Sequence, residues 1–155
     1  MISHTLIIAE AGVNHTGDID LARQLIDAAA DAGADLIKFQ TFRAAELATG
    51  LARMAAYQEA AIGDQLSQLQ MLRKLELEYE AHRTLIAHCS ERDIGFLSTA
   101  FDIPSVDLLL SLGPDLFKIP SGELTNLPYL RYIGQLGKKV ILSSGMATLS
   151  EIEDA

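Results

Sequence analysis

A repeated unit of strand, polar turn and helix is the feature that most constrains how this chain can fold. Each unit opens with an apolar run that is short enough to be a buried strand. Five such runs occur, at residues 6–10, 36–41, 95–101, 116–120 and 140–144. A helical pattern lies between each run and the next, and one more follows the last run. Strands that alternate with helices in this way predict a parallel sheet with right-handed crossover connections.

The helices are predicted from their capping residues and their apolar stripes. The first begins near Asp18 or Asp20, the second covers residues 77–92, and three more begin after Asp102, Asn126 and Thr148. The stripes expected to pack inward are Leu21, Ala22, Leu25, Ile26 and Ala29; then Leu75, Tyr79, His82, Ile86 and Cys89; then Val106, Leu109 and Leu110; and finally Leu127, Leu130 and Ile133.

Charged or hydroxyl side chains end every predicted strand, which suits a TIM (β/α)8 barrel, whose active sites lie at that face. No Gly-x-Gly-x-x-Gly follows the first strand, and this disfavours a dinucleotide-binding sheet. A full barrel needs about 250 residues, whereas this chain has 155 and ends inside a helix that has only just begun. We therefore expect residues 1–155 to be the N-terminal part, about five β/α units, of a TIM barrel in a larger α/β enzyme. An open, doubly wound five-stranded sheet is the alternative.

Composition narrows the class of partner. The formal net charge is −9, which disfavours nucleic acid and anionic membrane surfaces as partners because both attract basic proteins. The one cysteine, Cys89, allows no internal disulfide and falls in an apolar helical pattern. No secretory signal is visible, and no apolar run approaches the roughly 20 residues of a membrane span. A cytoplasmic protein is the expectation.

A long segment, residues 42–71, separates the second predicted strand from the second helix. At about 30 residues it is longer than an ordinary connection between a strand and a helix. It leaves the sheet at the same end as Glu10, so it could be a lid or a partner surface. A helical insertion that packs for structural reasons explains it equally well.

In a parallel barrel the side chains at the strand ends converge on one mouth. Here that mouth would hold Glu10, Asn14, His15, Lys38, Gln40, Thr99, Lys118, Ser121, Glu123, Ser143 and Ser144. Two lysines, several hydroxyls and nearby helix N-termini make a site for a phosphate or carboxylate. Two carboxylates beside that site could transfer protons or hold sugar hydroxyls.

Each of these residues also has a structural interpretation. Glu10 and Lys38 could form a simple ion pair, and Lys118 could pair with Asp102 or Glu123. The hydroxyls could be turn formers or helix caps, and His15 could bond the backbone of its own turn. Lysines in two different strands are nevertheless hard to explain as accidents, because buried lysine is rare unless it is paired.

Five ordered motifs resemble those of a known family. They are Ile8-Ala9-Glu10-Ala11-Gly12-Val13-Asn14-His15-Thr16-Gly17, Lys38-Phe39-Gln40-Thr41, Ser98-Thr99-Ala100-Phe101-Asp102, Lys118-Ile119-Pro120-Ser121-Gly122-Glu123 and Leu142-Ser143-Ser144-Gly145-Met146. The family is the sialic acid synthases, which comprise N-acetylneuraminate synthase and its legionaminate and pseudaminate relatives. The resemblance covers essentially the whole chain and is specific for the family, though not for the sugar.

The resemblance implies a transferase of carbohydrate and polysaccharide biosynthesis that condenses phosphoenolpyruvate with an N-acetylated hexosamine, such as N-acetylmannosamine. The products would be a nine-carbon 2-keto acid and phosphate, with a divalent metal (Mn²⁺ or Mg²⁺) polarising the sugar aldehyde. Glu10 and Glu123 would be the acid–base groups, and Gln40 would bind the sugar. By the same resemblance, phosphoenolpyruvate would be held by Lys38, Thr99, Lys118, Ser121 and Ser143.

The chain departs from the family pattern in two respects. Ala100 stands where the family usually has proline. The family's metal-binding histidines and its antifreeze-like C-terminal domain, which reaches over a partner's active site, would lie beyond Ala155. We therefore expect no complete metal site in this chain, a homodimeric enzyme, and no activity from this segment alone. A Schiff-base aldolase using Lys38 or Lys118, and a non-catalytic phosphate- or sugar-binding half-barrel, are the competing hypotheses.

Overall fold

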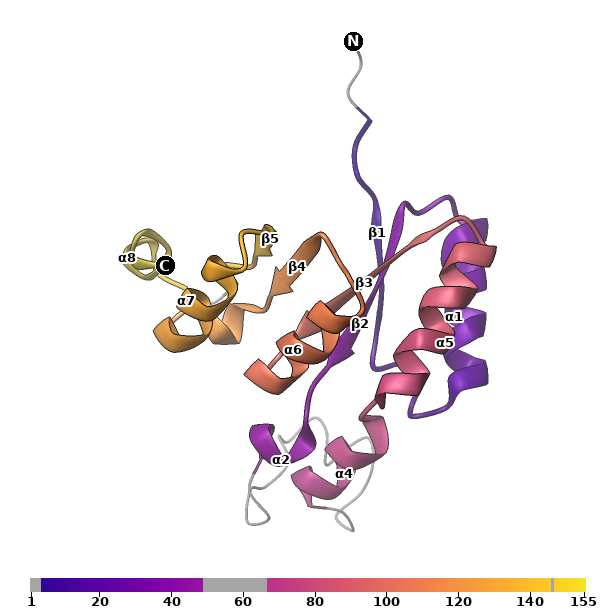
Figure 1. Ribbon diagram of the computed structural model, residues 1–155, viewed down its shortest axis with the longest axis horizontal. Coiled ribbons are helices and arrows are strands. Elements are labelled where there is room, and N and C mark those ends of the chain that lie inside the picture. The colour runs from indigo at the N-terminus through magenta and orange to yellow at the C-terminus, as the bar shows by residue number, and fades with distance from the viewer. Residues whose placement is uncertain (1–3, 49–66, 146) are drawn as a thin grey trace.

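The computed structural model describes residues 4–48, 67–145 and 147–155. Its five parallel strands are β1 (Ile8–Gly12), β2 (Leu36–Thr41), β3 (Gly95–Ala100), β4 (Leu116–Ile119) and β5 (Lys139–Leu142). The described helices are α1 (Ile19–Asp31), α2 (Ala44–Leu47), α4 (Gln68–Leu75), α5 (Tyr79–Glu91), α6 (Ile103–Ser111), α7 (Leu127–Gln135) and α8 (Leu149–Asp154), and a 3₁₀ turn covers Ser121–Glu123 (Figure 1).

The strands lie side by side in chain order, β1-β2-β3-β4-β5, and every neighbouring pair is parallel. A doubly wound sheet reverses its strand order at a switch point, so this order is that of a barrel wound in one direction. The structure therefore confirms the prediction of about five β/α units of a TIM barrel and rules out the doubly wound alternative.

Two apolar clusters join the helices to one face of the sheet. The first packs α1 and α5 against β1 to β3, and the second packs α6 and α7 against β3 and β4. Phe96 of β3 contacts both clusters, so α5 and α6 cover the same face. In β2, Ile37 and Phe39 are buried against these helices while Lys38 and Gln40 alternate with them on the opposite, inward face.

Four of the predicted helix starts are confirmed, and the fifth helix, α5, begins at Tyr79 rather than near residue 77. The side chain of Asp18 accepts hydrogen bonds from the first turn of α1, Asp102 caps α6, and Asn126 caps α7. Thr148 forms the predicted capping box with Glu151 at the start of α8. Because an N-cap side chain bonds a backbone N–H two or three residues away, these starts depend only on local sequence.

Two of the predicted stripes, and the start of β1, need correction. Leu85, rather than Tyr79, is buried with His82 and Cys89 in α5, and Tyr79 is 42% exposed. In α7 the buried residues are Tyr129 and Ile133, whereas Leu127 is 44% exposed. Tyr79 and Leu127 are each the first residue of their helix. β1 runs from residue 8 to residue 12 rather than from 6 to 10, because Ala11 and Gly12 continue the strand through a bulge.

The long segment after β2 is described only at its two ends. Helices α2 and α4 contact one another beyond the carboxyl end of β2 (Figure 1). The Arg43 guanidinium and the Ala44 N–H both donate to the carboxylate of Glu76, each at 3.0 Å. These hydrogen bonds hold the start of the segment next to the residues that follow its end. Residues 49–66 lie outside the described residues, so the choice between a lid and a packed insertion stays open.

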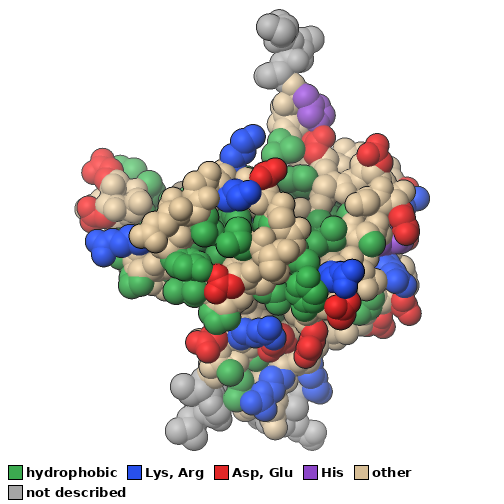
Figure 2. Space-filling model, viewed as in Figure 1, with side chains coloured by type: hydrophobic (Ala, Val, Ile, Leu, Met, Phe, Trp, Pro, Cys, Tyr) green, Lys and Arg blue, Asp and Glu red, His purple; other side chains and the backbone are tan. Residues whose placement is uncertain are grey.

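The surface agrees with a sheet whose two outer strands are edges. Leu6 and Ile7, just before β1, are 52% and 49% exposed, and Val140 and Leu142 of β5 are 41% and 38% exposed. Figure 2 shows apolar side chains gathered across the middle of one face, with charged side chains scattered around them. Within the described residues, no helix is both long and apolar enough to cross a bilayer.

Candidate active site

A row of polar side chains crosses the inward face of the sheet near its carboxyl end. Lys38, Thr99 and Lys118 come from β2, β3 and β4, and Ser143 directly follows β5. Glu10 pairs with Lys38 in the strand register, and Thr99 pairs with Lys118. Because parallel strands in register place equivalent residues side by side, all five strands contribute to one surface. The structure thus brings these five predicted site residues together.

Lys38 and Glu10 form an ion pair at the β1 side of this row. Lys38 Nζ lies 2.5 Å from Glu10 Oε2, and it donates a hydrogen bond to Thr99 Oγ1 at 3.3 Å. The lysine side chain is 15% exposed and the glutamate side chain is 53% exposed. The structural interpretation of these two residues as an ion pair is therefore observed, and it leaves about half of the glutamate side chain exposed.

Lys118 has a different environment. Its Nζ donates to Ser143 Oγ at 2.5 Å and to the Ile119 carbonyl at 2.7 Å. Neither Asp102 nor Glu123 pairs with it, so that alternative is wrong. Burial lowers the pKa of Lys118, and the nearby positive charge of Lys38 lowers that pKa further, while Glu10 raises it. Lys118 is thus a desolvated cation whose hydrogen-bond partners are neutral oxygens, a setting that an incoming anion would stabilise.

Gly12 brings the groups at the end of β1 close together. The register between β1 and β2 shifts after Glu10, and Gly12 has a φ of +54°, as expected of a bulge glycine. A Cβ at this position would lie 3.1 Å from Glu10 Oε1 and 3.6 Å from Gln40 Nε2. A side chain here would therefore crowd the Glu10 carboxylate and touch Gln40, so both groups lie beside Gly12 at the strand end.

The residues after β4 are positioned separately. A Cβ on Gly145 would lie 3.6 Å from Ser121 Oγ, so Ser121 lies beside the exit of β5. Glu123 accepts a hydrogen bond from Asn126 Nδ2 at 2.6 Å and lines an open groove of about 570 Å³ together with Phe101. Its hydrogen-bond partner is thus outside the lysine row, and the structure does not join Glu123 to Glu10.

His15 does not line the mouth. Its side chain is fully buried, and Nδ1 accepts a hydrogen bond from the Gly17 N–H at 3.0 Å. Burial lowers the pKa of His15, and the nearby His82 adds to that effect. The inclusion of His15 among the mouth residues was wrong, and the alternative, that it bonds the backbone of its own turn, is correct.

Sequence reasoning missed a group of buried polar side chains behind this row. Thr41, Ser98 and His82 are in hydrogen-bond contact on the helix-facing side of β2 and β3. The available signal was a hydroxyl at strand positions where the alternation demands an apolar residue. The position of His82 in an apolar helical stripe indicates packing but no hydrogen-bond partner.

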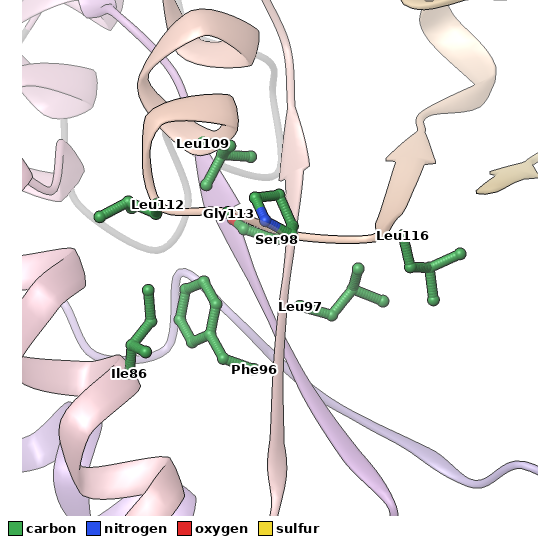
Figure 3. A pocket seen from close by; sticks show the side chains of 9 residues that line it. Ile86, Phe96, Leu97, Ser98, Leu109, Leu112, Gly113 and Leu116 are labelled. Atoms are coloured by element: carbon green, nitrogen blue, oxygen red, sulfur yellow. The ribbon is translucent and has the colours of Figure 1, made fainter. Parts of the chain in front are cut away.

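A second hollow lies away from the lysine row. It has a volume of about 210 Å³ between α5, α6 and the first half of β3, and its lining is apolar apart from Ser98 (Figure 3). Ile86 of α5 and Phe96 of β3 lie next to one another in its lining. It offers no charged group to a ligand, so it is not a candidate for the anion site.

The donor set of the described residues does not fit a divalent metal. No three His, Cys, Asp or Glu side chains among them come close enough together to hold an ion. Glu10 is already committed to Lys38, and His15 is enclosed in its turn. The described residues therefore offer a divalent metal no set of three ligands.

Comparison with known proteins identifies the family. The family model described as "NeuB family" matches residues 25–155. The chain is 58% identical to the N,N'-diacetyllegionaminic acid synthase of Campylobacter jejuni, covering 97% of this chain and 45% of that protein. It is 46% identical to the N,N'-diacetyllegionaminic acid synthase of Legionella pneumophila, covering 96% of this chain and 42% of the relative.

A solved structure agrees with these matches. The N-acetylneuraminic acid synthetase of Leptospira borgpetersenii, crystallised with citrate, superimposes with a TM-score of 0.81 at 34% identity, over 98% of this chain and 48% of that one. The chain thus spans less than half the length of the relatives it matches. Because the family model covers most of the chain and the fold agrees, the chain belongs to the NeuB family of sialic acid synthases.

Proposed function

We propose that this chain supplies the phosphoenolpyruvate-binding side of a synthase that joins phosphoenolpyruvate to an N-acetylated hexosamine. C3 of phosphoenolpyruvate attacks the aldehyde carbon of the open-chain sugar, water adds at C2, and phosphate leaves. The product is a nine-carbon 2-keto sugar acid. The single observation that carries this proposal is the row of Lys38, Thr99, Lys118 and Ser143 along four adjacent strand ends.

The row suits a ligand with two anionic groups. Lys38 and Lys118 each supply a positive charge, and Thr99 and Ser143 supply hydroxyls that already touch the two ammonium groups. Phosphoenolpyruvate carries a phosphate and a carboxylate, and fixed cations and donors stabilise both as charge moves toward the leaving phosphate. Ser121, beside the exit of β5, is assigned to the same ligand.

The sugar and the proton transfers are assigned to the neighbouring groups. Gln40, which lies beside Gly12 with Glu10, would hold the sugar. An anion that binds Lys38 competes with Glu10 for the ammonium group, so substrate binding would free this carboxylate for acid–base work. Glu123 is the second acid–base candidate and would act from the open groove at the end of β4.

The relatives narrow the sugar. Two of them are N,N'-diacetyllegionaminic acid synthases, and their product name specifies two acetylated nitrogens. Removing the three carbons that phosphoenolpyruvate contributes from a nine-carbon product leaves a six-carbon aldose with two acetamido groups. We therefore propose a di-N-acetylated hexose as the acceptor, in preference to a singly acetylated one such as N-acetylmannosamine.

The setting of the reaction is also part of the proposal. The resemblance of the motifs supports an enzyme of carbohydrate biosynthesis that is cytoplasmic and homodimeric. The same resemblance supports a dependence on Mn²⁺ or Mg²⁺, bound by residues outside this chain. For the same reason the 155-residue chain alone should release no phosphate.

The test is a phosphate-release assay on the full-length protein. Phosphoenolpyruvate would be supplied with manganese and with a panel of hexoses carrying two, one or no acetamido groups. Release that requires both the metal and the di-N-acetylated sugar is the expected result. Release with a singly acetylated sugar alone would correct the acceptor. No release with any sugar, or borohydride trapping of a pyruvate adduct on a lysine, would refute the proposed reaction.

A further inference from the structure

A directional chain of hydrogen bonds runs behind the lysine row, from α5 to β2 and β3. Thr41 Oγ1 lies 2.7 Å from His82 Nε2 and 2.7 Å from Ser98 Oγ, and His82 Nδ1 lies 2.9 Å from the Glu78 carbonyl. A carbonyl oxygen only accepts, so Nδ1 carries the hydrogen and Nε2 of the neutral imidazole is an acceptor. The Thr41 hydroxyl therefore donates to His82, and the Ser98 hydroxyl donates to Thr41.

The three side chains that form this hydrogen-bond chain, Thr41, Ser98 and His82, are all buried away from water. His82 is fully buried, Thr41 is 2% exposed and Ser98 is 4% exposed. Burial lowers the pKa of His82, which favours the neutral imidazole that the chain requires. A buried hydroxyl or imidazole without a partner is costly. The three groups therefore satisfy one another only when β2, β3 and α5 hold this one relative position.

The hydrogen-bond chain of His82, Thr41 and Ser98 lies directly behind two residues of the proposed active site. Thr41 follows Gln40 in β2, and Ser98 precedes Thr99 in β3. Gln40 and Thr99 are partners in the strand register, as are Phe39 and Ser98. Because side chains alternate along a strand, a contact made on the helix-facing side fixes where the inward neighbours point.

We infer that His82, Thr41 and Ser98 are positioning residues for carbon–carbon bond formation. This inference rests on the proposed function, in which Gln40 holds the sugar and Thr99 holds phosphoenolpyruvate. The hydrogen-bonded chain then sets the placement of one substrate relative to the other without touching either. An error in the approach of two reacting carbons lowers the turnover rate while each substrate still binds, and a displacement of about 1 Å can cost about 100-fold.

Thr41→Val tests the chain in the full-length protein. Valine keeps the shape of threonine but removes the hydroxyl, which leaves His82 without its donor and Ser98 without its acceptor. We expect kcat to fall about 10- to 100-fold while the KM values for both substrates change less than about threefold. Thr41→Ser restores the hydroxyl and should recover most of kcat. The matched control is Thr84→Val in α5, whose hydroxyl, among the described residues, donates only to the Glu80 carbonyl of its own helix.

Two further measurements keep the inference testable should Thr41→Val fold poorly. Ser98→Ala removes only the last donor, and it should lower kcat less than Thr41→Val while leaving KM unchanged. Nitrogen NMR of His82 in the wild-type protein should show hydrogen on Nδ1 and none on Nε2. Hydrogen on Nε2 would contradict the direction of the chain.

The outcomes separate this inference from the function on which it rests. An active wild-type protein in which folded Thr41→Val or Ser98→Ala keeps full kcat would overturn the positioning role alone. Higher KM values with unchanged kcat would also overturn it, because the defect would then lie in binding rather than in alignment. A wild-type protein that releases no phosphate with any sugar would refute the proposed function itself, and with it the substrates assigned to Gln40 and Thr99.

Discussion

Replacement of Lys118 by methionine should lower activity without weakening the fold. The variant loses the bonds from Nζ to Ser143 Oγ and to the Ile119 carbonyl. That carbonyl also accepts the Ser143 N–H at 3.1 Å, so it keeps a partner, and the half-buried Ser143 hydroxyl can turn to solvent. Because no buried group is left without a hydrogen bond, the free energy of unfolding should change by less than about 1 kcal/mol.

The loss of activity can be estimated from the same contacts. A hydrogen bond to a charged group contributes about 1.5–3 kcal/mol, which corresponds to about 10- to 150-fold in rate. We therefore expect kcat/KM for phosphoenolpyruvate to fall by about that factor in the full-length protein, measured by phosphate release. The matched control is Lys139→Met, which removes the same charge from an exposed position at the start of β5 and should leave kcat/KM unchanged.

The pH dependence of this variant has a definite sign. The folded protein holds the pKa of Lys118 below its ordinary 10.5, mainly by burial, so the charged form is disfavoured by folding at neutral pH. Methionine removes that cost, and any stability gained over wild type should shrink as the pH rises toward 10.5. Thermal unfolding between pH 7 and pH 10 would measure it. A variant with full kcat/KM, or one destabilised by more than about 2 kcal/mol, would refute the view of Lys118 as an unpaired cation held for an anion.

Three further predictions concern the fold and are checked by thermal or urea unfolding. Tyr129→Phe removes a buried hydroxyl that donates to a β3 carbonyl at 2.6 Å, and it should cost about 1–2 kcal/mol; no change would show that the carbonyl finds water. Gly33→Ala, at a positive φ with nothing within 4 Å of the new Cβ, should lower the free energy of unfolding by about 1 kcal/mol. Gly17→Ala has a similar φ but places its Cβ 2.1 Å from a backbone oxygen of α4, so it should cost more. Equal losses for the two variants would contradict the steric argument. Burial lowers the pKa of His15 and His82 below 6.5, so the fold favours the neutral imidazoles and loses stability as the pH falls below that value. A melting temperature no lower at pH 5 than at pH 7 would contradict this.

The architecture was predictable because its signals are local. β2 was predicted with its observed bounds, since apolar and polar residues alternate from Ile37 to Gln40 within a short run. Asp102 and Asn126 ended up as helix caps because capping needs only a side-chain oxygen and a backbone N–H two or three residues later. The extent of β1 was harder to predict, since Gly12 signals a turn but is used here for a bulge inside the strand.

The composition of the lysine row was also predictable, although the partners within it were not. Parallel strands in register bring their carboxyl ends to one edge whatever the details of packing, so Lys38, Thr99 and Lys118 had to lie near one another. Which group each lysine would contact depended on distances of a few ångströms. The sequence allowed Lys118 to pair with a carboxylate, and the structure gives that role to Lys38 alone, through Glu10.

The buried chain behind the row could not be predicted, because its members meet only in the folded protein. Thr41 is 41 residues from His82 and 57 residues from Ser98 along the sequence. A hydroxyl in a strand and a histidine in a helical stripe each have several ordinary uses, so neither pattern points to the other. Only the packing of α5 against β2 and β3 shows that the three groups satisfy one another. A polar residue at a strand position that the alternation assigns to the core therefore indicates a buried hydrogen-bond partner elsewhere in this fold.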